Sequence, residues 1–224
     1  MQKLEEGIHE FQANYFASNR RMFERLAEAG QRPETLFITC SDSRVVPTLI
    51  TSTEPGELFI VRNVGNIVPS VARGVLGGVS AAIEYAVEVL DVGRVIVCGH
   101  TNCGAIDAIL HPERVGHLPN VSRWLAESSS IPKIIEERYG HLEGEARMIA
   151  AVEENVLIQL ENLRSFDFLA RKLDAGTLKM SGWIFNIATG GVFDFDPISG
   201  QFVEVGSPED ADRQRLSTRP PPPA

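Results

Sequence analysis

The sequence predicts an α/β fold, namely an open, mainly parallel β-sheet flanked by helices. Three short apolar runs point to this class, at residues 35–40 (TLFITC), 58–62 (LFIVR) and 94–99 (RVIVCG). Their apolar character is continuous rather than alternating, which is typical of strands covered on both faces of a parallel sheet. A helix is predicted over residues 77–90, so the order strand, helix, strand gives a βαβ unit with a right-handed crossover.

Two of the predicted helical regions carry apolar faces. In the first thirty residues, apolar side chains recur at helical spacing, at Leu4, Ile8, Phe11 and Tyr15. Gly30 is the expected end of this region, since Pro33 follows closely. On the helix over residues 77–90, the expected apolar side consists of Ala82, Tyr85, Ala86 and Val89.

The C-terminal half begins with residues 111–144, which contain three prolines and are expected to be irregular. A long helix is expected from about Glu145. A hairpin that forms the edge of the sheet is expected from residues 178–187 and 192–196. We expect residues 1–205 to form a single domain and residues 206–224, which end in a run of prolines, to form a flexible tail.

The charge balance and the apolar pattern exclude several classes of protein. With 21 Lys and Arg against 30 Asp and Glu, the net charge is −9, so no broad basic surface for nucleic acid is expected. The best candidate for a membrane span, residues 74–90, is interrupted by Glu84 and Glu88, so no membrane association is expected. The first ten residues are charged and lack the apolar core of a secretory signal, which favours a cytoplasmic location.

Two polar motifs directly follow predicted strands, CSDSR at residues 40–44 and HTNCG at residues 100–104. In open α/β sheets, ligands bind at the carboxyl ends of the strands, where neighbouring strands bring such motifs together. Two cysteines and a histidine suit zinc, and three protein ligands leave a tetrahedral ion one open position for catalysis. We therefore predict that Cys40, His100 and Cys103 hold one Zn²⁺ ion per subunit. Cys98, inside the third strand, is expected to be a small buried hydrophobe.

Asp42 and Arg44 follow Cys40 by two and four residues. As a surface ion pair they would contribute little to stability. Beside a metal ion, Asp42 could be a fourth ligand, which would make the site structural. Alternatively, a bidentate Arg44 could hold the carboxylate off the metal, where it would accept a hydrogen bond from metal-bound solvent.

With these two motifs in place, the sequence resembles the β-class carbonic anhydrases. The resemblance extends through residues 54–68, 77–106, 154–163 and 181–190, and it covers about residues 1–205. It implies a zinc-dependent lyase that catalyses the reversible hydration of carbon dioxide to bicarbonate and a proton by a zinc-bound hydroxide. It also implies that the zinc ligands are those predicted above and that Asp42 and Arg44 form a gating pair.

The resemblance further implies a substrate pocket. Gln31, nine residues before Cys40, matches the glutamine that lies near substrate in the plant-like branch of the family. The side chains of Phe59, Val64 and Tyr85 match its apolar pocket, and the backbone N–H of Gly104 can meet the substrate. The resemblance implies a homodimer or a multiple of dimers, in which the N-terminal helices pack on a partner subunit and the pocket can be completed across the interface.

Two details refine the branch of the family. Another branch carries a non-catalytic bicarbonate site that needs a tryptophan three residues before the first zinc cysteine, and here this position is Phe37. We therefore expect the constitutively open, plant-like arrangement. Residues 141–145 (HLEGE) and the overall pattern are similar to cyanobacterial carboxysomal members, so a carboxysome location is an alternative to the cytoplasm.

Two other functions stay open at this point. A hydrolase of CS₂ or COS could use the same scaffold with a changed entrance. The other is a non-catalytic, zinc-stabilised binding or shell protein. Asp42 and Arg44 argue against that function, because a purely structural zinc site needs no pair to orient a water molecule.

Overall fold

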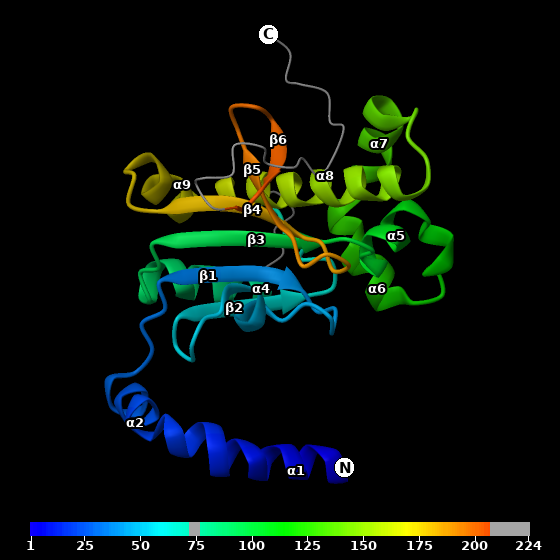
Figure 1. The fold of residues 1–224 in the computed structure, drawn as a ribbon. Coiled ribbons are helices and arrows are strands. Elements are labelled where there is room, and N and C mark those ends of the chain that lie inside the picture. The colour runs from blue at the N-terminus through cyan, green and yellow to red at the C-terminus, as the bar shows by residue number, and fades with distance from the viewer. Residues whose placement is uncertain (72–76, 207–224) are drawn as a thin grey trace.

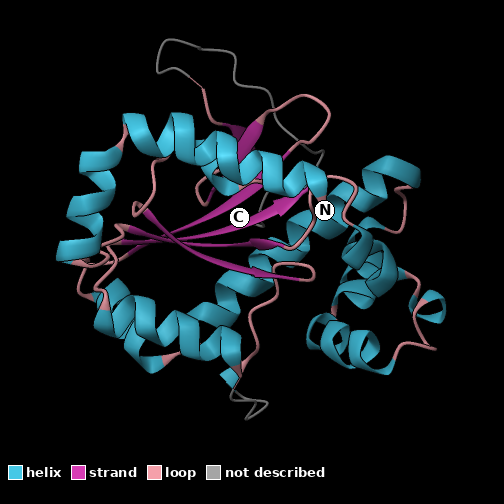
Figure 2. Ribbon diagram, turned by 90° about the horizontal axis from the view of Figure 1, so that it is seen from below, coloured by secondary structure: helices cyan, strands magenta, loops and turns pink. Residues whose placement is uncertain are grey.

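The computed structural model describes residues 1–71 and 77–206 and contains a six-stranded sheet with the strand order β2-β1-β3-β4-β5-β6 (Figures 1 and 2). The first four strands in this order run parallel, whereas β5 and β6 are antiparallel to their neighbours. The predicted α/β class, with its mainly parallel sheet and C-terminal edge hairpin, is therefore confirmed. The strands are β1 (Thr35–Cys40), β2 (Leu58–Asn63), β3 (Arg94–His100), β4 (Lys179–Phe185), β5 (Val192–Asp196) and β6 (Gln201–Glu204).

Helices lie in the connections from β1 to β2, from β2 to β3 and from β3 to β4, and further helical segments precede β1. Within these residues no helix is both long and apolar enough to cross a membrane. The principal elements are α1 (Gln2–Glu10), the π-helical segment η1 (Phe11–Phe16), α2 (Arg20–Ala29), α3 (Pro47–Thr51), α4 (Gly78–Glu84), the π-helical segment η3 (Tyr85–Val89), α5 (Gly104–Leu110), α6 (Pro119–Leu125), α7 (Ile131–Tyr139), α8 (Gly144–Arg164) and α9 (Asp167–Asp174).

The main core lies between one face of the sheet and helices that include α4, α5, α7 and α8. Alternate residues of the central strands point into it, for example Leu36 and Ile38 of β1, because side chains alternate between the two faces of a strand. The helix α8 approaches β3 and β4 closely at two glycines. A Cβ atom added to Gly99 or Gly182 would lie 2.8 or 2.9 Å from a methyl group of Val156.

Two expectations for the helices were wrong. Residues 111–144 are largely helical, because their three prolines occupy the first turns of short helices, where a missing N–H costs nothing. In the helix over residues 77–90, Ala86 is buried as expected, but the buried side also includes Ile83 and Val87, whereas Tyr85 and Val89 are exposed. Apolar residues occur on several sides of this helix, and the side that packs in the core carries the bulky, branched residues.

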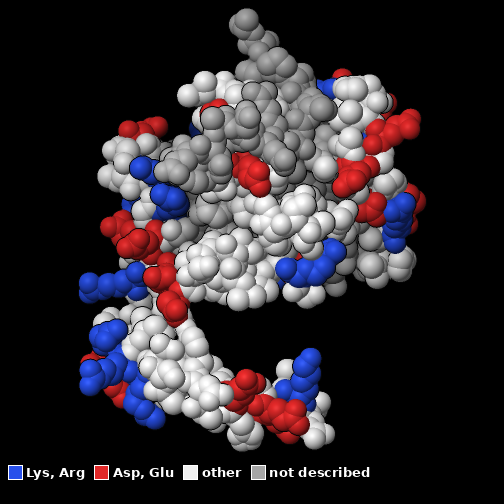
Figure 3. Space-filling model, viewed as in Figure 1, with Lys and Arg blue, Asp and Glu red and all other residues white. Residues whose placement is uncertain are grey.

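The N-terminal arm, formed by α1, η1 and α2, extends away from the body of the molecule (Figures 1 and 3). None of its residues is buried in the described structure. The predicted apolar face is present and exposed, with Leu4 72% and Ile8 55% accessible. One tie to the body is the hydroxyl of Tyr15, which donates a hydrogen bond to the carboxylate of Glu54. Of the predicted tail, residues 207–224 lie outside the described residues.

The contact between α8 and the sheet predicts the effect of adding one methyl group at Gly182. We expect Gly182→Ala to lower the free energy of unfolding by about 1–3 kcal/mol, because the added Cβ overpacks the core against Val156 and Leu160. Urea unfolding at fixed protein concentration measures this. Gly93→Ala is the control, since a Cβ there meets nothing within 4 Å. Equal midpoints for the two variants would contradict the close approach of α8.

Candidate metal centre

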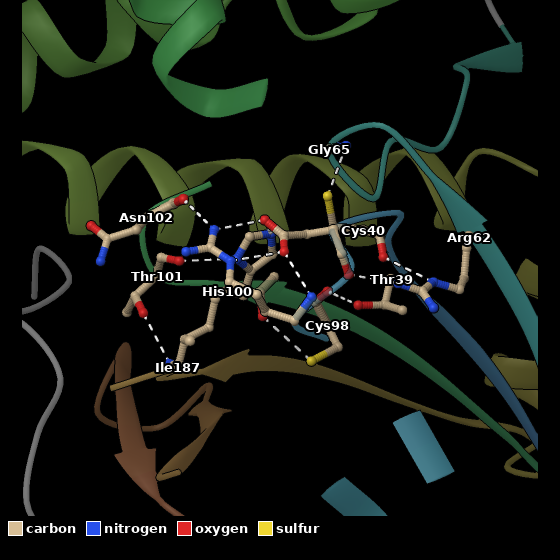
Figure 4. Close-up of polar contacts among 12 residues, drawn as sticks. Thr39, Cys40, Arg62, Gly65, Cys98, His100, Thr101, Asn102 and Ile187 are labelled. Carbon is tan, nitrogen blue, oxygen red and sulfur yellow. Dashed lines mark hydrogen bonds and ion pairs between the residues drawn. The ribbon is translucent and has the colours of Figure 1, made fainter. Parts of the chain in front are cut away.

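Three potential metal ligands converge at the carboxyl edge of the sheet, and Figure 4 shows two of them, Cys40 and His100. The Sγ atoms of Cys40 and Cys103 and a ring nitrogen of His100 lie within 4.8 Å of one another, and all three residues are buried. Cys40 is the last residue of β1, and His100 is the last residue of β3. Because β1 and β3 are adjacent and parallel, their ends meet. Cys103 joins them from the position directly before α5.

The imidazole of His100 is oriented for ligation. Its Nδ1 lies 2.9 Å from the carbonyl oxygen of Thr101, so Nδ1 carries the proton and donates to that oxygen. The lone pair of Nε2 is then free, and this buried atom has no hydrogen-bond partner among the described residues. A buried acceptor without a donor is costly, and a metal ion would satisfy it.

The two cysteines of the cluster cannot both ionise without a cation. A hydrogen bond from the Cys103 thiol lowers the pKa of Cys40 to about 4, against the opposing effect of burial. The same hydrogen bond, together with burial, raises the pKa of Cys103. Burial thus disfavours a second negative charge beside the first. A divalent ion removes this conflict by neutralising both thiolates, so the donor set fits a thiophilic metal such as zinc.

Cys98 differs from the two clustered cysteines. It lies within β3, is fully buried, and packs in a small second core with Phe37 and Ile96. Burial raises its pKa to about 12, so it stays a thiol. This agrees with its predicted place as a buried hydrophobe.

Hydrogen bonds fix the loop that follows Cys40 (Figure 4). Arg62, near the end of β2, donates from Nε to the carbonyl oxygen of Cys40 at 3.2 Å and from Nη2 to that of Asp42 at 2.7 Å. The backbone N–H of Gly65 points at the Sγ atom of Cys40, with 3.5 Å between nitrogen and sulfur. An N–H directed at a thiolate stabilises its negative charge.

Asp42 and Arg44 form a bidentate ion pair beside the cluster. Arg44 donates from Nε to Oδ1 at 2.9 Å and from Nη2 to Oδ2 at 2.7 Å, and its backbone N–H also donates to Oδ1. These bonds hold the pKa of Asp42 well below its usual range. Its Oδ2 lies 3.8 Å from Nε2 of His100, which is too far for a hydrogen bond. Of the two arrangements considered above, the structure therefore has the carboxylate held by arginine.

Comparison with known proteins places this centre in a family. A family model described as carbonic anhydrase matches residues 35–192. A carbonic anhydrase of Synechocystis sp. is 43% identical over 204 residues, which cover 91% of this chain and 74% of the relative. A carbonic anhydrase of Pseudomonas aeruginosa is 42% identical over 205 residues, and 92% of each protein is covered.

Solved structures give the class within that family. The structure of the β-carbonic anhydrase CcaA has 43% sequence identity and a TM-score of 0.88, and the match covers 92% of this chain and 99% of that chain. The chain belongs to the β-carbonic anhydrase family. A structure of the tetrameric β-carbonic anhydrases of Sordaria macrospora has 28% identity and a TM-score of 0.77, with 86% of this chain and 95% of that chain covered.

In this β-carbonic anhydrase, one chain does not bring all the expected pocket residues to the cluster. Val64 adjoins Gly65, and Gly104 follows Cys103, so both lie near the metal ligands. The rings of Phe59 and Tyr85 lie 6.1 Å apart, but Phe59 is paired with Leu36, near the start of β1. Four residues of strand, roughly 13 Å, separate that position from Cys40.

Gln31 is also remote from the cluster of its own chain. It precedes β1 and lines a hollow at the amino ends of the strands with Arg94 and Lys179, the first residues of β3 and β4. The metal ligands lie at the carboxyl ends of the same strands. Gln31, Phe59 and Tyr85 therefore lie away from the metal centre of the chain that carries them.

Some residues that shape the centre were missed in the sequence. Arg62 is a polar residue at the end of a predicted strand, which is a signal that could have placed it at the functional edge. Asn155, Gln159 and Asn162 of α8 repeat at helical spacing, and two of them are fully buried. Such amides on an apolar helix indicate polar partners in the core. The indole N–H of Trp124 donates to the carbonyl oxygen of Val64 at 2.7 Å. No pattern in the sequence indicates this contact.

The cluster predicts which residue changes abolish metal binding. We expect Cys103→Ala to lose the tightly bound metal, because two ligands replace three, as measured by metal content per subunit after gel filtration. Cys98→Ala is the matched control and should keep the metal, because that sulfur is protonated and belongs to the other core cluster. Full metal occupancy in Cys103→Ala would show that the ligand assignment is wrong.

Proposed function

We propose that this member of the β-carbonic anhydrase family catalyses the reversible hydration of carbon dioxide to bicarbonate and a proton, with Zn²⁺ held by Cys40, His100 and Cys103. The convergence of two sulfurs and a free imidazole nitrogen, beside an ionised carboxylate that is not a ligand, supports this function best. When bound, the ion supplies a Lewis acid that makes a water molecule nucleophilic near neutral pH.

Asp42 orients the attacking water. Its carboxylate stays ionised because Arg44 holds its pKa down, so it can accept a hydrogen bond but cannot donate one. A water that donates a hydrogen bond to Asp42 has a lone pair directed elsewhere, toward the substrate. Arg44 also donates from Nη2 to the carbonyl oxygen of Asn102 at 3.2 Å, which fixes the pair in place.

The substrate side of the site is polar at one point and apolar elsewhere. Gly104 is the first residue of α5, where backbone N–H groups have no partner within the helix. Its N–H can stabilise the charge that develops on a substrate oxygen. The side chain of Val64, which is 45% exposed, offers an apolar surface for a small apolar gas.

We assign Gln31, Phe59 and Tyr85 to the site of a partner subunit. All three lie away from the metal ligands of their own chain, and Tyr85 is 44% exposed although it is aromatic. The N-terminal arm also exposes an apolar face, which includes Leu4 and Ile8 and which a second copy could cover. A homodimer or a multiple of dimers follows, in agreement with the tetrameric relatives from Sordaria macrospora.

The plant-like, open branch and the location are part of the same proposal. Both carboxylate oxygens of Asp42 accept hydrogen bonds from Arg44, which would leave the fourth position of a bound ion open. The three cysteines are free, and a reducing compartment such as the cytoplasm keeps Cys40 and Cys103 available as ligands. The similarity to the Synechocystis relative keeps the carboxysome as the alternative location.

A carbon dioxide hydration assay on protein of known metal content tests the function. We expect activity in the parent chain and a loss of about a hundredfold or more in Asp42→Ala, which should keep its metal, because only the orientation of water is lost. Parallel assays with CS₂ and COS distinguish the alternative hydrolase. A metal-loaded parent chain that is inactive on all three substrates would support a non-catalytic binding protein.

Mixing two inactive variants tests whether a pocket is shared between subunits. Gln31→Ala lacks the glutamine, and Cys103→Ala lacks a metal ligand. In a mixed dimer, the intact metal centre of the first receives Gln31 from the second, so unfolding and refolding an equimolar mixture should restore about a quarter of parental activity. Each variant refolded alone is the control. No recovery in mixed dimers would mean that Gln31 does not act across the interface.

A further inference from the structure

The loop that follows β2 has a backbone conformation that needs outside support. Gly65 has φ +84° and Asn66 has φ +49°, so two successive residues are left-handed, and the second is not a glycine. A Cβ at Gly65 would lie 3.1 Å from Cβ of Ala105 in α5. Gly65 therefore permits both the left-handed turn and the close approach to the helix that follows Cys103.

Trp124 of α6 holds the first peptide unit of this loop. Its indole N–H donates to the carbonyl oxygen of Val64 at 2.7 Å. That carbonyl and the N–H of Gly65 belong to one planar peptide group, and this N–H points at the Sγ atom of Cys40. A hydrogen bond accepted by the oxygen fixes the direction of the N–H and polarises it, because linked hydrogen bonds strengthen one another.

Buried amides of α8 hold the next peptide units. Asn155 donates from Nδ2 to the carbonyl oxygen of Gly65 at 3.0 Å, and its own oxygen accepts a hydrogen bond from Gln159 at 2.8 Å. Gln159 in turn accepts a hydrogen bond from the backbone N–H of Val68 at 2.9 Å. With this side of the loop fixed in the core, the contact from Trp124 determines the tilt of the peptide that faces the sulfur.

We propose that Trp124 is a positioning residue for the metal centre, which acts through the Val64–Gly65 peptide to direct an N–H at the Cys40 thiolate. The N–H draws negative charge from the sulfur, so the thiolate donates less charge to a bound ion. This inference rests on the proposed zinc site.

Replacing Trp124 by Phe tests the relay, because it keeps an aromatic ring and removes the N–H donor. In the cobalt(II)-substituted protein, we expect the sulfur-to-cobalt charge-transfer absorption to move to lower energy, since a sulfur without its hydrogen bond gives up charge more readily. Zinc affinity, measured by competition with a chromophoric chelator, should fall about tenfold, because the loss of the contact that orients the Cys40 sulfur outweighs its stronger donation of charge. Trp183→Phe is the matched control and should leave the absorption and the zinc affinity unchanged. Trp183 lies on β4, which β3 separates from β1, and its ring contacts Phe37 edge-on.

A second replacement separates the relay from a general loss of packing. Substituting 3-benzothienylalanine for Trp124 keeps the shape of the ring and puts sulfur in place of the N–H group. It should reproduce the spectral shift of Trp124→Phe. If either folded variant has the absorption and the zinc affinity of the parent, the inference is overturned and the proposed function is untouched. If the parent itself binds neither zinc nor cobalt, the proposed function fails instead.

Discussion

Two buried sulfurs whose negative charges need a cation between them set the main constraint on this protein. The sheet forces them together, because Cys40 ends β1 and Cys103 follows β3, and burial keeps water from separating their charges. A divalent cation is the simplest solution, and the free nitrogen of His100 supplies the third donor. Other residues of the site hold these three side chains in position. Arg62 fixes the backbone after Cys40, and Gly65 contributes an N–H to its sulfur.

In this site, the side chains that can bind a metal ion are different from the carboxylate that can orient water. The carboxylate of Asp42 is close enough to the cluster to compete as a ligand, but both of its oxygens are engaged by Arg44. Arg44 donates in turn to the carbonyl oxygen of Asn102, which lies between His100 and Cys103 in the second motif. The two motifs are therefore connected by a cationic side chain as well as by the centre itself. Such a connection allows the metal geometry and the carboxylate to be set together.

The sequence was sufficient for β1 to β5 and for the cluster, because both depend on short-range patterns, whereas the edge strand β6 was not predicted. Continuous apolar runs mark buried strands, and residues at the ends of parallel strands converge whatever the intervening chain does. The wrong predictions concern segments whose local sequence pattern is compatible with two different structures. Prolines in residues 111–144 begin helices instead of breaking them, and the helix after β2 has apolar residues on several sides. The contact of Trp124 with Val64 joins residues 60 positions apart, and no local pattern encodes such a distance.

Gln31 follows the N-terminal arm almost directly, since α2 ends at Ala29. If the arm docks on a second copy, the same movement carries this glutamine toward a neighbouring active site. Assembly and competence for turnover would then be a single event. A newly synthesised monomer would then bind its metal and have no activity. Dilution that dissociates the subunits would abolish activity without unfolding the chain.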